Sequence, residues 1–135
     1  MYDLDRFLTA QRRDYTAALR EIQNGRKRSH WIWYIFPQVA GLGMSSTSQY
    51  YAISGLDEAR AYLREPTLRA HLLEISSALL ALDESDPTAV FGFPDDLKLR
   101  SSMTLFAAAA PVFSAVLDKF FGGQPDTRTL QILGL

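Results

Sequence analysis

The chain has 135 residues, of which 47% are hydrophobic and 21% are charged, and its 14 basic and 15 acidic side chains leave a formal net charge of −1. This length and composition predict one globular domain with an ordinary hydrophobic core and exclude a disordered chain. The charge balance argues against a protein that coats nucleic acid or an anionic membrane over its whole surface, because such partners select for a large excess of Lys and Arg.

The sequence contains no cysteine, so disulfides, thiolate nucleophiles and zinc–sulfur sites are excluded and the cytoplasm is the expected compartment. Residues 1–15 lack the basic and apolar regions of a signal peptide, and no apolar run approaches the roughly 18 residues of a membrane span. We therefore expect neither export nor membrane insertion.

The spacing of apolar residues predicts an all-α fold in which one domain, residues 1–135, forms an irregular orthogonal bundle of six to eight helices. The first helix should cover about 4–23, with Asp3 as its N-cap and Gly25 just past its end. The expected helices that follow cover about 29–36, 47–52, 56–63, 67–83, 95–110, 112–120 and 127–133, with a turn or a short helix around Val90. No segment alternates apolar and polar residues in the way of a surface strand.

Residues 25–43, GRKRSHWIWYIFPQVAGLG, form a basic–aromatic segment that contains both tryptophans of the chain, Trp31 and Trp33. Three cations and no acid lie between Ile22 and Leu56. Guanidinium and ammonium groups recognise phosphate or carboxylate, and aromatic rings offer stacking faces to a base. The segment thus suits a nucleotide-like anion.

We expect Arg26, Arg28, Trp31 and Trp33 to contact such a ligand, and the flexible backbone of Gly41 and Gly43 to approach it closely. In a competing structural interpretation, the cations are a solvated loop and the tryptophans belong to the core.

His30 is a candidate for proton transfer, although a histidine beside an aromatic run is often structural. Its distance in sequence from His71 and the absence of an HxxxH spacing give a zinc or iron site little support, so we assign no metal ligands.

Residues 94–106, PDDLKLRSSMTLF, form a polar helix segment. If the apolar positions face the core, one neighbouring stripe carries Asp95, Lys98 and Ser102, which could lie within mutual reach. In the structural alternative, Asp95 is an N-cap and Asp96 forms an i,i+4 ion pair with Arg100. Residues 83–96 hold five acids and no base, and we expect this acidic run to dock against the basic–aromatic segment.

At these segments the sequence resembles domain of unknown function family 1810, a group of small, mostly bacterial proteins. The matching stretches are GRKRSHWIWYIFPQ with GLG, then GLDEARAYL, then FGFPDDLKLRSSMTLF, and the resemblance runs through nearly the whole chain. It implies a helical single-domain protein without an established reaction. It therefore assigns no catalytic residues. The first and last of the matching stretches coincide with the basic–aromatic segment and the polar helix segment.

We expect the two segments to meet in one pocket that binds a phosphorylated or nucleotide-like anion. The sequence leaves open whether this ligand is also a substrate. Arg26, Arg28, Lys98 and Arg100 would hold the anion, Trp31 or Trp33 would wall the pocket, and His30, Asp95 and Ser102 would transfer protons or orient the ligand. The alternatives are a protein-interaction module and a single-stranded nucleic-acid binder that use the same residues. No residue pattern assigns a cofactor or an oligomeric state.

Overall fold

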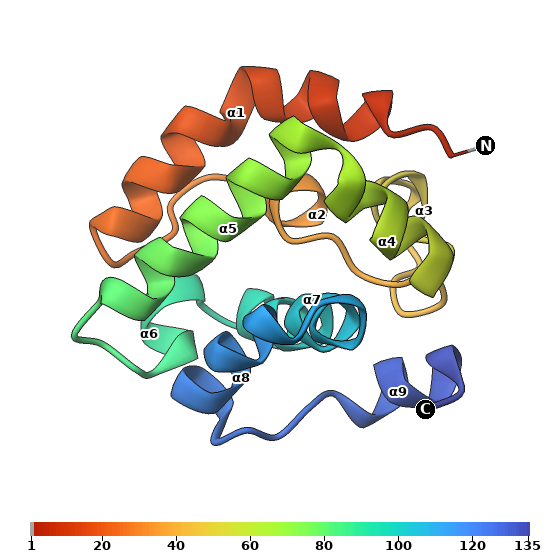
Figure 1. Ribbon diagram of the computed structural model, residues 1–135. Coiled ribbons are helices and arrows are strands. Elements are labelled where there is room, and N and C mark those ends of the chain that lie inside the picture. The colour runs from red at the N-terminus through yellow and green to blue at the C-terminus, as the bar shows by residue number, and fades with distance from the viewer. Residues whose placement is uncertain (1) are drawn as a thin grey trace.

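The computed structural model describes residues 2–135, and that range contains nine α-helices and one short 3-10 helix (Figure 1). The longer helices are α1 (Asp5–Gln23), α4 (Leu56–Arg64), α5 (Pro66–Ala81), α7 (Asp95–Ala109) and α8 (Ser114–Phe121). The shorter ones are α2 (Ile32–Ile35), α3 (Ser46–Tyr50), α6 (Pro87–Phe91) and α9 (Thr127–Leu133), and the 3-10 helix is η1 (Pro111–Phe113). The all-α prediction is confirmed, and the α-helices number nine because the segment around Val90 is a helix.

The orthogonal arrangement is visible in Figure 1, where α1 and α5 lie across the view and α7 is seen nearly end-on beneath them. Helices α1 and α5 pack along each other, while α7 contacts α4, α6, α8 and α9. Within the described range the one β-type contact is a parallel bridge between Val39 and Ile53.

Helix α1 begins one residue later than the sequence predicts. Its N-cap is Leu4, and no side chain caps it. Asp3 instead contributes its backbone carbonyl, which accepts a hydrogen bond from the Arg6 guanidinium. At the other end Gly25 has a φ of 79°, a left-handed conformation that glycine adopts without strain, so the chain can leave the helix there.

Helix α7 is the central element of the core. Six consecutive residues, 101–106, are buried, so the middle of this helix is covered on all sides. A helix enclosed in this way has no polar stripe facing solvent along its middle. The stripe predicted for the polar helix segment therefore reaches the surface only in the first two turns of α7, at Asp95 and Lys98, whereas Ser102 is buried.

No helix among residues 2–135 combines the length and the apolar character that crossing a bilayer demands.

Candidate functional site

The basic–aromatic segment and the start of α7 meet at the carboxylate of Asp95. Its Oδ2 lies 2.8 Å from Nζ of Lys27, and its Oδ1 lies 3.3 Å from Nζ of Lys98. Asp95 is the first residue of α7 and follows the N-cap, Pro94, so the predicted N-cap role of Asp95 is corrected. The carboxylate instead joins two lysines from segments that are far apart in the sequence.

Lys27 is the more buried of the two lysines, with a side chain that is 6% exposed. Its ammonium also donates to the carbonyl of Ser29 at 2.6 Å and lies 5.0 Å from the centre of the Trp31 ring. Its backbone N–H donates to the carbonyl of Val90 at 2.7 Å. Lys27 therefore fastens the loop after α1 to α6 and α7, and its charge is used within the protein.

Lys98 is more accessible and lies beside the second tryptophan. Its side chain is 26% exposed, and its ammonium is 5.2 Å from the centre of the Trp33 ring, which is partly buried. Trp31, in contrast, is 1% exposed, and its indole N–H donates to Glu21 at 2.9 Å. Of the two tryptophans, Trp33 is thus the one that a ligand can reach.

Glu21 organises the chain between α1 and α2. Its carboxylate accepts hydrogen bonds from the backbone N–H groups of Arg28 and Ser29, from the Ser29 hydroxyl and from Trp31. Partial burial opposes the charged form, but these donors outweigh it and lower the pKa of Glu21 to about 2. The carboxylate is therefore ionised at neutral pH and positions the basic–aromatic segment.

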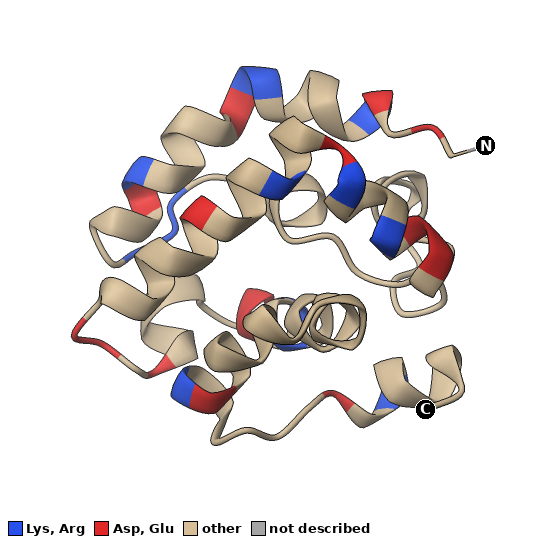
Figure 2. Ribbon diagram, in the orientation of Figure 1, with Lys and Arg blue, Asp and Glu red and all other residues tan. Residues whose placement is uncertain are grey.

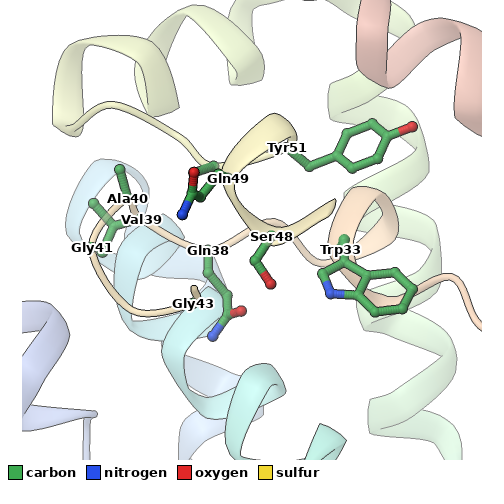
Figure 3. A pocket seen from close by; sticks show the side chains of 10 residues that line it. Trp33, Gln38, Val39, Ala40, Gly41, Gly43, Ser48, Gln49 and Tyr51 are labelled. Atoms are coloured by element: carbon green, nitrogen blue, oxygen red, sulfur yellow. The ribbon is translucent and has the colours of Figure 1, made fainter. Parts of the chain in front are cut away.

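Three adjoining cavities share lining residues and together form what we call the Trp33 groove, and Trp33 lines two of them. The central cavity measures about 100 Å³, and Figure 3 shows side chains that line it. It is lined by Trp33, Gln38, Val39, Ala40, Gly41, Gly43, Ser48, Gln49, Tyr51 and Ala52.

At one end of the groove, a cavity of about 170 Å³ shares Gln38, Gly43 and Ser48 with the central one and includes Lys98. At the other end, an open cavity of about 480 Å³ shares Trp33 with the central one and includes Arg13. The groove therefore has a cation near each end and an indole between them.

The wall opposite Trp33 is shaped by two glycines. Gly41 has a φ of 102°, which favours glycine, and it turns the chain after the bridge between Val39 and Ile53. At Gly43 an added Cβ would lie 2.5 Å from Cβ of Ser48, so only glycine lets the loop pack against α3. Both residues line the groove, as the ligand prediction requires, and their role here is to shape it.

The segment after α3 is held by a buried ion pair. Nη2 of Arg6 lies 3.1 Å from Oε2 of Glu58, and these side chains are only 9% and 4% exposed. The same guanidinium donates to the carbonyls of Tyr50 and Ala52 at 2.9 Å, and Glu58 accepts from the backbone N–H of Ser54 at 2.8 Å. This contact fixes the rim of the groove to α1 and α4.

The remaining cations of the basic–aromatic segment point elsewhere. Arg26 and Arg28 are exposed, and Arg26 lines a separate cavity of about 400 Å³ with Lys27, residues 88–91 of α6 and Gly92. His30 is also exposed, and its backbone carbonyl accepts a hydrogen bond from the hydroxyl of Tyr34 at 3.2 Å. The acidic run meets the basic segment through Asp95 and Lys27, a lysine that the site prediction did not include. Figure 2 shows the basic run as a blue stretch in the loop after α1.

Two residues of the polar helix segment are turned away from the Trp33 groove. Arg100 donates to the carbonyl of Gln124 at 2.8 Å and lies over the Phe121 ring, so its charge serves the C-terminal part of the chain. Ser102 is fully buried, and its hydroxyl has no hydrogen-bond partner among the described residues. Neither side chain is positioned to contact a ligand in the groove.

The structural alternative for this segment also needs correction. Asp96 is buried and accepts a hydrogen bond from the Thr88 hydroxyl at 2.6 Å, while Arg100 is engaged with Gln124. Within residues 2–135 there is no ion pair between Asp96 and Arg100. Asp96 instead ties α6 to the first turn of α7.

Sequence reasoning missed Lys27, Gln38, Ser48 and Arg13 as residues around the two segments. Lys27 stands inside the RKR triplet, where composition cannot tell the buried cation from its exposed neighbours. Gln38 follows the proline that ends the aromatic run, and this polar residue between Pro37 and Val39, both buried, is a signal that could have been used.

The fold and groove together define a small all-α protein with a cation–indole groove built from its two motif segments. A family model described as "Protein of unknown function (DUF1810)" matches residues 1–133, and the chain belongs to this family. It is also similar to the conserved hypothetical protein Rv1873 from Mycobacterium tuberculosis, whose crystal structure superposes with a TM-score of 0.96. The two are 44% identical, over 99% of this chain and 98% of that one. No curated protein matches the chain.

Proposed function

We propose that the protein binds a small anionic ligand that carries a planar ring, of the phosphorylated or nucleotide-like class, in the Trp33 groove. The observation that carries this proposal is the Lys98 ammonium, 5.2 Å from the centre of the Trp33 ring, where both side chains are partly exposed and line adjoining cavities. An ammonium beside an indole offers one contact to an anion and another to a ring.

The charge of Lys98 remains available to a ligand. Asp95 is shared between Lys98 and Lys27, and the closer contact, 2.8 Å against 3.3 Å, is with Lys27. One carboxylate and two ammonium groups leave a local charge of +1. Asp95 therefore orients Lys98 without neutralising the site, which makes it a positioning residue in this proposal.

The lining of the groove suits an anion for a second reason. Among the described residues, no Asp or Glu lines any of its three cavities, and the charged groups that do are Lys98 and Arg13. With no carboxylate in its lining, the groove places no negative charge directly against a phosphate. Arg13 is partly engaged, at 2.9 Å from Asp14, so we assign the anion to the Lys98 end.

The two alternative functions have less support. A partner-binding surface or a single-stranded nucleic-acid platform would use both tryptophans as exposed anchors, and Trp31 is 1% exposed. Arg26 and Arg28 are exposed cations, but they do not line the groove with Trp33. The observations thus favour a concave site for a small molecule over an extended basic track.

Calorimetric titration with adenosine 5′-monophosphate and with phenyl phosphate tests the proposal. We expect Lys98→Ala to weaken the binding of both compounds about tenfold, which corresponds to about 1.4 kcal/mol. Trp33→Ala should weaken both, while Trp33→Phe, which keeps a ring, should weaken them less. Arg20→Ala is the matched control, since Arg20 is an exposed cation on α1 outside the groove and should leave binding unchanged.

The same titrations separate the alternatives. If neither compound binds the wild-type protein at millimolar concentration, the proposal is wrong. Tight binding of an oligonucleotide with a steep dependence on salt would favour the nucleic-acid alternative instead.

A further inference from the structure

We infer that the side-chain amide of Gln38 forms hydrogen bonds with the edge of the ligand's ring. Because a nucleobase carries donors and acceptors on its edge, the ligand class is then a nucleoside phosphate and not simply an aromatic anion. This inference rests on the proposed function and goes beyond it by naming the part of the ligand that is recognised and the residue that recognises it.

The amide of Gln38 is free to bind a ligand. Gln38 is partly buried and lines both the central cavity and the Lys98 cavity, yet its side chain makes no hydrogen bond with any described residue. Other amides nearby are engaged. Gln11 donates to the Tyr34 carbonyl and the Tyr62 hydroxyl and pairs with His71, and Gln49 donates to the carbonyl of Met44.

Backbone hydrogen bonds hold the chain at Gln38 in place, and this sets the direction in which its side chain leaves the backbone. The Gln38 carbonyl accepts from the N–H of Ile53 at 2.8 Å, and the N–H of Ala40 donates to the Ile53 carbonyl at 2.8 Å. Gln38 lines both the central cavity and the Lys98 cavity, so its side chain faces the groove.

The position of Gln38 relative to the other groove residues supports this role. Figure 3 shows the side chains of Gln38, Ser48 and Trp33 extending to the same side of the cavity, with Ser48 between the other two. Gln38 also belongs to the cavity that contains Lys98. A ligand whose ring contacts Trp33 and whose phosphate contacts Lys98 spans both cavities that Gln38 lines, which brings it within reach of the amide.

An amide is chemically suited to that edge. It carries a donor and an acceptor side by side, and it pairs with a base that offers an acceptor and a donor at matching positions, as glutamine does with adenine. A phenyl ring stacks equally well on an indole but has no such groups. The Gln38 amide can thus distinguish a base from a plain aromatic ring.

The test compares adenosine 5′-monophosphate with phenyl phosphate on the whole protein and on Gln38→Met, a substitution that preserves size and removes the amide. We expect the wild-type protein to bind the nucleotide about tenfold more tightly than phenyl phosphate, and Gln38→Met to abolish that difference while leaving phenyl phosphate affinity unchanged. Gln23→Met, an exposed glutamine on α1, is the matched control and should retain the difference. Thermal unfolding of each variant verifies that it folds.

A second measurement does not depend on a variant. In nitrogen-15 NMR spectra, the side-chain amide signals of Gln38 should shift more on addition of the nucleotide than on addition of phenyl phosphate, because only the nucleotide forms hydrogen bonds with the amide. If Gln38→Met weakens both compounds alike, or leaves the tenfold difference in place, this inference is overturned while the proposed function stands. If neither compound binds the wild-type protein, both fail.

Discussion

Lys27, in the loop after α1, pairs with Asp95 at the start of α7, with Nζ and Oδ2 2.8 Å apart and the lysine side chain only 6% exposed. The pair joins two segments that are 68 positions apart in the chain. It also fixes the carboxylate that orients Lys98, so stability and the geometry of the Trp33 groove depend on the same contact.

Lys27→Met should lower the free energy of unfolding by about 3 kcal/mol, because removing one partner leaves the mostly buried Asp95 carboxylate without its closer cation. Urea denaturation at neutral pH measures this. Arg26→Met, next in the chain, alters an exposed cation and should change stability by less than about 0.5 kcal/mol. Equal effects of the two substitutions would contradict the assigned role of Lys27.

Arg6→Met should cost about 3 kcal/mol, since it leaves Glu58 unpaired and removes the donors to the carbonyls of Tyr50 and Ala52. Hydrogen exchange at the Ser54 amide, which donates to Glu58, should become faster at the same time. The exposed pair of Arg60 with Asp57, at 3.5 Å, is the comparison, and Arg60→Met should have almost no effect. Unchanged exchange at Ser54 would show that the ion pair does not hold this segment.

The stability of the protein should depend on the ionisation of Glu21. The folded-state pKa is lowered to about 2 from an ordinary value of 4.5, so its stabilising contribution is present above about pH 4.5 and is lost as the pH falls toward 2. Glu21→Gln should cost about 2 kcal/mol at neutral pH, because charge-assisted hydrogen bonds are lost.

The difference in unfolding free energy between wild-type protein and Glu21→Gln should shrink as the pH is lowered from 5 to about 2.5. Urea denaturation across this range measures it. A difference that stays constant with pH would mean that the hydrogen bonds, and not the charge, account for the effect.

The adjacent serines of α7 should respond in opposite ways to replacement by alanine. The buried hydroxyl of Ser102 has no partner among the described residues, so Ser102→Ala should stabilise the protein by about 1 kcal/mol. Ser101 donates to the Leu97 carbonyl at 3.1 Å and lies 3.3 Å from a carboxylate oxygen of Asp126, so Ser101→Ala should destabilise it by about 1 kcal/mol. Thermal unfolding distinguishes the two. Loss of ligand binding in a well-folded Ser102→Ala variant would restore Ser102 to the site.

Much of the fold could be predicted from the sequence because the helices depend on local patterns. The apolar spacing located α1, α5 and α7 to within two residues at each end, and Pro111 marked the break that the structure resolves as η1. The predicted N-cap of α1 is wrong by one residue, because the helix begins after Leu4. The Arg6 guanidinium, which has no role in the apolar pattern, donates both to the Asp3 carbonyl and to Glu58, and the contact with Glu58 spans 52 positions.

The site could be predicted only in part. The sequence identified the two segments that meet, since an acid-free run of cations and tryptophans next to a polar helix is unusual in a chain of balanced charge. It could not assign individual side chains, because neighbours in the chain differ in burial for tertiary reasons. Trp31 and Trp33 are two residues apart, yet one is bonded to Glu21 in the core and the other lines the groove.

The amino-acid sequence by itself thus determined the all-α class, the helix positions, the family and the two segments that carry the candidate site. Helical periodicity, proline and glycine act over a few residues and are readable without coordinates. The tertiary structure alone decided that Lys27 and not Arg26 pairs with Asp95, that Arg100 and Ser102 face away from the groove, and that the Gln38 amide is free. These outcomes depend on burial and on contacts between residues that are distant in the chain. Both are determined by the packing of α1, α4 and α7.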